Sequence, residues 1–115
     1  MIRVNIIKDE LIIKSVYKDV KDGILMAWAQ ENAVNPGYAI FSDVGELIEI
    51  NDKDNVFELL VRASLNRMDL DGVAVAYCYA EEYFDELKKL GFKENGRRVE
   101  VVIKDFFKPC CNKRQ

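Results

Sequence analysis

Residues 72–92, GVAVAYCYAEEYFDELKKLGF, constrain the fold of this chain more than any other segment. Residues 73–76 are small and apolar and are followed by Tyr77, as expected of a buried strand over 73–77. From residue 80 to residue 90 the apolar positions recur at helical spacing, which predicts an amphipathic helix. Gly91 stands where a helix ends in a left-handed conformation, and Phe92 can fold back onto the last turn. The segment therefore predicts a strand, a helix and the start of another strand.

The segments before residue 38 are predicted with one alternative open. Alternating apolar residues predict a strand over residues 2–7. Residues 11–17 fit either the return strand of a hairpin or the start of a long helix, and the run Leu11, Ile12, Ile13 favours the hairpin. Residues 18–33 are predicted as a helix, because Val20, Ile24, Ala27 and Trp28 would share one face. Asn35-Pro36-Gly37 would end that helix.

The rest of the chain gives clearer patterns. Residues 38–41 and 46–50 form a predicted hairpin, and residues 51–55 break the pattern after it. Residues 56–68 are amphipathic and predict a helix, whereas residues 99–107 predict a final strand. The fold class is therefore α/β of the α+β type, in the order β(β)α-ββ-α-β-α-β. A mostly antiparallel mixed sheet would be flanked by about three helices, with the strands ending near residues 50 and 77 as parallel neighbours.

Composition limits the classes of function. The 115 residues suit one domain, predicted over residues 1–109 with a polar tail at 110–115. A net charge of −3 gives no reason to expect nucleic acid or an anionic membrane as a partner. No apolar run approaches the ~20 residues that cross a bilayer. Three cysteines argue against a disulfide framework, so we expect a cytoplasmic protein. Histidine is absent, which excludes Ser/His and Cys/His nucleophile pairs.

The segment KLGFKENG, residues 89–96, together with the order of elements over residues 38–107, resembles the GNAT-type N-acetyltransferases. That family would have a strand and one or two helices before residue 38, which this short N-terminal part fits loosely. The resemblance implies an acyl-CoA fold, with acetyl-CoA as the cofactor. It also implies a V-shaped splay between the strands at Ile50 and Tyr77.

The first functional element of that family is a glycine-rich turn between a strand and a helix, and the backbone amides of this turn bind the CoA pyrophosphate. Here the turn reads Asn51-Asp52-Lys53-Asp54-Asn55, without glycine or arginine and with two carboxylates. We therefore expect weak or absent CoA binding. If CoA does bind, the resemblance places its contacts on Ile50, Asn51, Lys53, Asn55, Val56 and Phe57.

The second functional element is a tyrosine four residues before the glycine of the signature. Many members of the family use this tyrosine as a general acid. That position is Leu87 here, and an apolar residue indicates core packing. Tyr77 or Tyr79 could replace the missing phenol, although alternation is expected to place one of them in the core. Glu49 is a candidate general base, with a solvated strand face as the alternative.

Cys110 and Cys111 are the candidates outside the core for a soft metal or a redox thiol. They lack the C-x-x-C spacing of a chelating pair, so no metal site is predicted.

Three hypotheses follow. The favoured one is a small GNAT-like domain with a degenerate acyl-CoA site, acting as a ligand-binding or protein-interaction module. The second is a divergent acetyl-CoA-dependent N-acetyltransferase. The third is a ferredoxin-like regulatory domain, which strand order would distinguish from the other two. A small molecule, a protein or a second copy of the chain are the expected partners.

Overall fold

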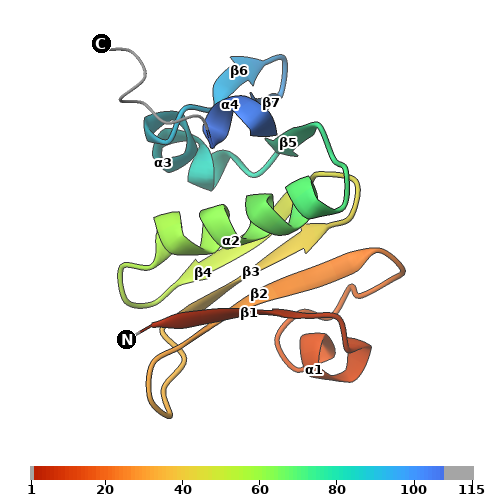
Figure 1. Ribbon diagram of the computed structural model, residues 1–115, viewed down its shortest axis with the longest axis vertical. Coiled ribbons are helices and arrows are strands. Elements are labelled where there is room, and N and C mark those ends of the chain that lie inside the picture. Colours follow the sequence, from red (N-terminus) through yellow and green to blue (C-terminus); the bar gives the residue numbers. More distant parts are fainter. Residues whose placement is uncertain (1, 108–115) are drawn as a thin grey trace.

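The computed structural model describes residues 2–107, arranged as two antiparallel sheets with one long helix between them (Figure 1). The larger sheet has the order β1 (Arg3–Ile7), β2 (Ile24–Gln30), β3 (Gly37–Ser42) and β4 (Leu47–Asp52). The smaller sheet has the order β5 (Val75–Cys78), β7 (Arg98–Val102) and β6 (Lys93–Asn95). The helical segments are α1 (Glu10–Lys14), α2 (Phe57–Leu70), η1 (Glu81–Tyr83), α3 (Phe84–Lys89) and α4 (Ile103–Phe106).

The main core lies on the α2 side of the larger sheet. The inward positions of α2 are buried because the helix is covered by the larger sheet on one side and by the smaller sheet and α4 on the other. They are Leu60, Val61, Ser64, Leu65 and Met68. Burying one such apolar side chain contributes roughly 1.5–3 kcal/mol. The predicted helix over residues 56–68 is confirmed, with two further residues at its C-terminal end.

The predicted hairpin of β3 and β4 is confirmed, and it contains a bulge. Ile40 pairs with Glu49 and Phe41 pairs with Leu47, which leaves Ile48 without a partner in β3. A bulge shifts the alternation of side chains by one residue. Leu47 and Ile50 can therefore both face the core, where they are 1% and 5% exposed.

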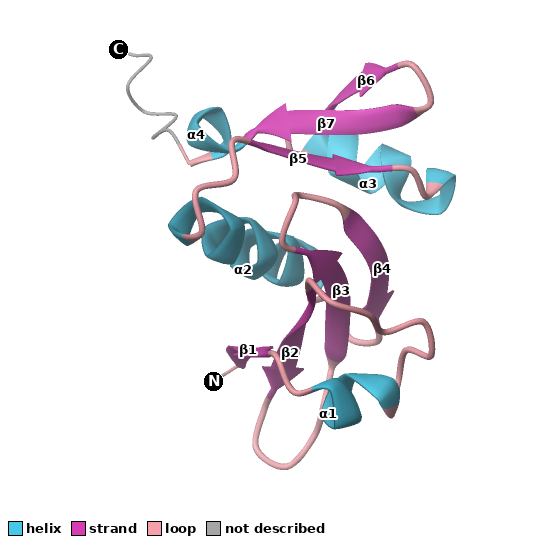
Figure 2. Cartoon of the chain, turned by 90° about the vertical axis from the view of Figure 1, so that its right-hand side faces the viewer, coloured by secondary structure: helices cyan, strands magenta, loops and turns pink. Residues whose placement is uncertain are grey.

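The two sheets join at one place, between the start of β4 and β5. Glu46 forms an isolated parallel bridge with Tyr77, and the Tyr77 N–H donates to the Gly45 carbonyl at 2.8 Å. Beyond this bridge the two strands belong to different sheets and diverge (Figure 2). We call this divergence the splay. The predicted parallel neighbours are thus in contact at a single bridge. Among residues 2–107 no strand lies between β4 and β5, so the ferredoxin-like alternative is wrong.

The hairpin interpretation of residues 11–17 is wrong, because this segment begins with helix α1. Asp9 caps the helix: its carboxylate accepts hydrogen bonds from the N–H groups of Leu11 and Ile12 at 2.9 and 3.4 Å. Glu10 in the first turn and Lys14 in the last turn suit the helix dipole. The capping residue outweighs the strand preference of the apolar run.

The helix predicted over residues 18–33 is also wrong, because the segment is a loop followed by β2. Gly23 has φ +86°, and its carbonyl accepts from the Asp43 N–H at 2.8 Å, so it closes the loop before the strand. β2 is covered on both faces, one by α2 and the other by a second core cluster around Ile13 and Met26. A strand buried on both faces loses the alternation that identifies it in sequence.

The C-terminal third follows the prediction in order, with shorter elements. Residues 80–90 form η1 and then α3, and the strand whose start was predicted after this helix is β6, which is only three residues long. The predicted strand 99–107 ends at Val102, because the Ile103 N–H donates to the Ala74 carbonyl at 3.0 Å and α4 begins there. The predicted tail, residues 110–115, lies outside the described residues, and the domain limits 1–109 remain a prediction.

Candidate functional site

The residues expected to contact a cofactor lie along β4 and at the start of α2, and one of their amides already has a partner. The Ile50 N–H donates to the Tyr83 hydroxyl at 3.0 Å. Tyr83 is the last residue of η1, which follows β5. Its phenol therefore crosses from the β5 side to the backbone of β4. The side chain fills part of the splay.

Tyr83 also contacts the start of α2. Its ring lies 6.2 Å from the ring of Phe57, measured between centroids, with the planes tilted by 45°. Burial raises the pKa of Tyr83, an effect that the hydrogen bond from Ile50 partly offsets. The hydroxyl is therefore neutral at physiological pH. We call Tyr83 and Phe57 together the aromatic plug.

A second expected amide is also engaged by the chain itself. The Val56 N–H, at the N-cap of α2, donates to the Asp52 carboxylate at 2.7 Å. The turn is closed further by the Lys53 N–H, which donates to the Pro36 carbonyl at 2.9 Å. Asn55 supports it with φ +61°, a conformation that asparagine tolerates better than most residues. The Asp52 carboxylate thus lies at the N-terminal end of α2, where the helix dipole favours a bound anion.

A hollow of about 390 Å³ lies beside the plug, between the start of α2 and the C-terminal half of α3. Its charged residues are Glu58, Glu86 and Lys89. The Lys89 ammonium lies 3.2 Å from the Glu86 carboxylate, so its charge is partly compensated. The hollow is therefore poorly suited to a polyanion such as a pyrophosphate.

The candidate catalytic tyrosines are packed elsewhere. Tyr77 and Tyr79 lie on the outer face of the smaller sheet, with ring centroids 5.8 Å apart, and Arg98 lies 4.4 Å above the Tyr77 ring. The expectation that one of them enters the core is wrong, because residues two apart on a strand share a face. Cys78, between them, is the buried residue. Burial and the nearby Glu46 carboxylate raise the pKa of Tyr77.

Glu49 faces the side of the larger sheet opposite α2. Its carboxylate accepts a hydrogen bond from the Tyr38 hydroxyl at 3.2 Å. The Tyr38 ring stacks on Trp28, with centroids 6.1 Å apart. Glu49 is thus part of a polar and aromatic row on that face, away from Tyr83. Leu87 is fully buried in the main core, as its apolar character indicates.

The structure therefore brings two of the expected residues, Ile50 and Phe57, against Tyr83, one of the apolar positions of the helix predicted over residues 80–90. Tyr77, Tyr79 and Glu49 are not part of this group. The pairing of Tyr83 with Ile50 spans 33 positions in the chain. No local pattern identifies such a partner. Cys110 and Cys111 lie outside the described residues.

Cys78 is the one cysteine within residues 2–107, and its thiol is buried. Burial raises the pKa of Cys78 from 9.0 to about 11. The pKa of Cys78 is higher in the folded chain than in the unfolded chain, so the folded state favours the neutral thiol. The stability that the buried thiol contributes is therefore fully present below pH 9 and is lost as the pH rises through about 11. We expect the wild type to lose about 2 kcal/mol more than Cys78→Ala between pH 8 and pH 11, measured by urea unfolding. Equal losses would contradict the prediction.

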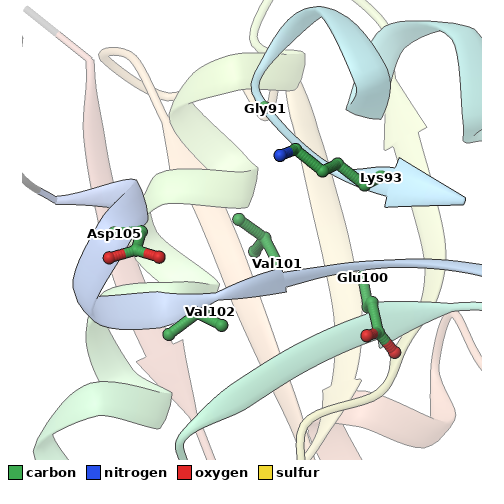
Figure 3. A pocket seen from close by; sticks show the side chains of 6 residues that line it. All are labelled: Gly91, Lys93, Glu100, Val101, Val102 and Asp105. Atoms are coloured by element: carbon green, nitrogen blue, oxygen red, sulfur yellow. The ribbon is translucent and has the colours of Figure 1, made fainter. Parts of the chain in front are cut away.

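A further hollow, of about 260 Å³, lies on the smaller sheet beside α4 (Figure 3). It is lined by Gly91, Lys93, Glu100, Val101, Val102 and Asp105. None of the candidate catalytic or cofactor-binding residues is among them. Within residues 2–107 no group of three or more acidic or cysteine side chains could hold a metal. No helix in the same range is long and apolar enough to span a membrane.

Solved structures resemble this fold. Tetrahymena GCN5 matches with a TM-score of 0.61 and 16% identity, over 82% of this chain and 75% of the other. The PaiA N-acetyltransferase of Thermoplasma acidophilum, solved with coenzyme A, matches with a TM-score of 0.60 and 18% identity, over 70% of this chain and 61% of the other. A GCN5-related N-acetyltransferase of Rhodopseudomonas palustris matches with a TM-score of 0.60 and 14% identity, over 69% of this chain and 61% of the other. No protein-family model and no curated sequence matches the chain.

These likenesses establish that the chain has the GNAT fold. The strand order, the single contact between β4 and β5 and the splay beyond it agree with the fold that the KLGF segment predicted. The fold class is confirmed as a mixed α+β arrangement with antiparallel sheets. At these identities the likeness concerns the fold alone, and the chain spans 61% of the PaiA protein.

Proposed function

We propose that this chain is a GNAT-fold domain whose acyl-CoA site is closed by its own side chains, and that it serves as a ligand-binding or protein-interaction module. The observation that carries the proposal is the hydrogen bond from the Ile50 N–H to the Tyr83 hydroxyl. This bond occupies a β4 amide at which CoA contacts are expected. A ligand that needs the same amide must first displace the phenol.

The charges at the start of α2 support the same proposal. A pyrophosphate at this helix end would meet the Asp52 carboxylate, which already accepts from the Val56 N–H. Asp54 adds a further carboxylate in the same turn, against the single ammonium of Lys53, whereas the Glu58 carboxylate is paired with Arg62 at 3.0 Å. Like charges in a partly desolvated site cost several kcal/mol when they are brought together. CoA binding is thus opposed both by occupancy and by charge.

The test is a melting curve with and without millimolar acetyl-CoA, with free CoA in parallel. A ligand at ~100 times its Kd would add about 2.7 kcal/mol to the free energy of unfolding. For a domain of this size that is a shift of roughly 10 °C or more. We expect no shift with either ligand. A clear shift would overturn the proposal.

A variant that opens the site makes this test sharper. The double variant Tyr83→Ala with Asp52→Asn removes the plugging phenol and one carboxylate, so any residual affinity for CoA should increase. Tyr79→Phe is the matched control, because Tyr79 is 51% exposed on the far sheet and contacts none of these residues. We expect a CoA-dependent shift in the double variant alone. An unresponsive double variant that melts cooperatively would show that the plug does not limit binding.

The alternative is a divergent acetyl-CoA-dependent N-acetyltransferase. It is favoured by the fold likeness to PaiA, which was solved with coenzyme A. In this case Tyr83 would move aside when the cofactor binds, and Ile50, Val56 and Phe57 would contact it. Turnover of acetyl-CoA with a panel of amines would support this function. A wild-type chain that shows neither a melting shift nor turnover would exclude it.

A further inference from the structure

We propose that two copies of this chain associate through the free edge of β1, in antiparallel register centred on Asn5. The inference goes beyond the proposed function and does not depend on it. It starts from the two outer edges of the molecule, β1 and β6, which differ in how they are protected.

The β6 edge is protected against pairing. It has three residues, Lys93–Asn95, all exposed, and two of them are charged. Short, charged strands are a common means of preventing edge-to-edge association. A partner strand would find few backbone groups and little apolar surface there.

The β1 edge lacks such protection. Its five residues pair with β2 in continuous register, without a bulge or a proline. Val4 and Ile6 are half-buried against the main core, so apolar surface remains at the open edge. Figure 1 shows β1 as the last strand of the larger sheet. An unprotected edge of this length is a template for another strand.

Antiparallel pairing of β1 with β1 of a second copy has one register that pairs all five residues. It places Asn5 opposite the partner's Asn5, and Val4 opposite the partner's Ile6. Val4 and Ile6 face the α2 side of the sheet, so the two copies would extend one continuous apolar layer. A shift by two positions would leave two residues of each strand unpaired.

Charge favours the same register. Arg3 is exposed and has no ion-pair partner within residues 2–107. In the proposed register it stands opposite the partner's Ile7, so the partner's Asp9 is its diagonal neighbour, within reach of a long side chain. Asp9 uses Oδ1 to cap α1, which leaves Oδ2 for a guanidinium. The contact occurs twice, because the pairing is symmetric.

One side of α2 faces away from the smaller sheet and adds some apolar surface. Arg62 lies 5.3 Å from the Phe106 ring of α4, so its side of the helix faces the smaller sheet. Ala63 and Leu70 lie four and three residues from Arg67 and share its side of the helix. Leu70 is 76% exposed. Arg67 lines a hollow together with Lys8, which directly follows β1, so this side of the helix lies near the end of β1.

Disulfide trapping tests both the association and the register. In a Cys110→Ser, Cys111→Ser background, Asn5→Cys should form a covalent dimer under mild oxidation. Paired residues have Cα atoms about 4.5–5.5 Å apart, within the range of a disulfide. Ile7→Cys is the matched control, because it keeps Arg3 and its symmetry mate would lie four residues away, about 13 Å. Cross-linking of both variants, or of neither, would overturn the register.

The oligomeric state is measured on the unmodified chain by light scattering after size exclusion. We expect twice the chain mass of 13.3 kDa at micromolar concentration. Arg3→Glu should raise the dimer Kd about tenfold or more, because it faces the partner's Asp9 with a like charge in both copies. Its fold should be unaffected, since Arg3 is exposed, and a melting curve checks this. A monomeric mass at 100 μM or above would overturn the proposal.

Discussion

Replacing Gly45 with alanine should lower the free energy of unfolding by about 3–5 kcal/mol. Gly45 has φ +111°, which strains any residue with a Cβ. A Cβ at this position would also lie closer than 3.0 Å to the Val75 carbonyl oxygen, which is backbone and cannot rotate away. The Gly45 carbonyl accepts the Tyr77 N–H at the junction of the two sheets. The substitution therefore pushes apart the strands on which the splay depends.

Urea unfolding followed by circular dichroism gives the change, and Gly72→Ala is the matched control. Gly72 has φ +84°, but no atom lies within 4 Å of its added Cβ. It should show the backbone strain alone, about 1 kcal/mol. If Gly45→Ala costs no more than Gly72→Ala, close packing at the junction is not what holds the sheets together.

The parts of the fold that could be predicted from sequence are those determined by local patterns. β1 alternates, α2 has an apolar stripe, and the β3–β4 hairpin is bounded by residues that favour turns. The KLGF segment predicted the GNAT fold because it resembles that family's signature, and in the structure it ends α3 at Gly91, which has φ +112°. In each case a few neighbouring residues determine the backbone conformation.

The errors arise where tertiary contacts outweigh local preference. Residues 24–30 are apolar on both faces because α2 covers one face and the second cluster the other, so helix and strand patterns became indistinguishable. For α1 a local signal existed: Asp9 precedes the apolar run as an N-cap. For β6 only its start after Gly91 was indicated, because its three exposed polar residues are held only by pairing with β7.

In the candidate site, too, the local features could be predicted from sequence and the contacts between distant residues could not. The absence of glycine in residues 51–55 was evident from sequence, and it predicted weak CoA binding, which remains a prediction. The sequence alone did not reveal that Asp52 binds the start of α2, or that Tyr83 binds β4. Both contacts depend on how the chain returns to the splay. A helical spacing that placed Tyr83 on the core face gave no hint of its hydroxyl's partner.

Leu87→Ala should lower the free energy of unfolding by about 2–5 kcal/mol and leave the response to acetyl-CoA unchanged. Leu87 is fully buried in the main core, and its carbonyl accepts from the Phe92 N–H at 3.1 Å, which closes the turn after α3. Truncation leaves a cavity between α3 and the smaller sheet. The position that holds a phenol in many GNAT enzymes is thus expected to act here through packing.

Leu70→Ala is the matched control, because Leu70 is 76% exposed and its truncation should change stability by less than about 0.5 kcal/mol. Both variants are compared by urea unfolding and by melting with acetyl-CoA. If Leu87→Ala kept its stability but altered the CoA response, Leu87 would belong to a ligand site. If it lost stability alone, a tyrosine placed there would have to displace core atoms before it could reach the splay. Restoring a catalytic phenol to this fold would then require repacking α3 as well as opening the plug.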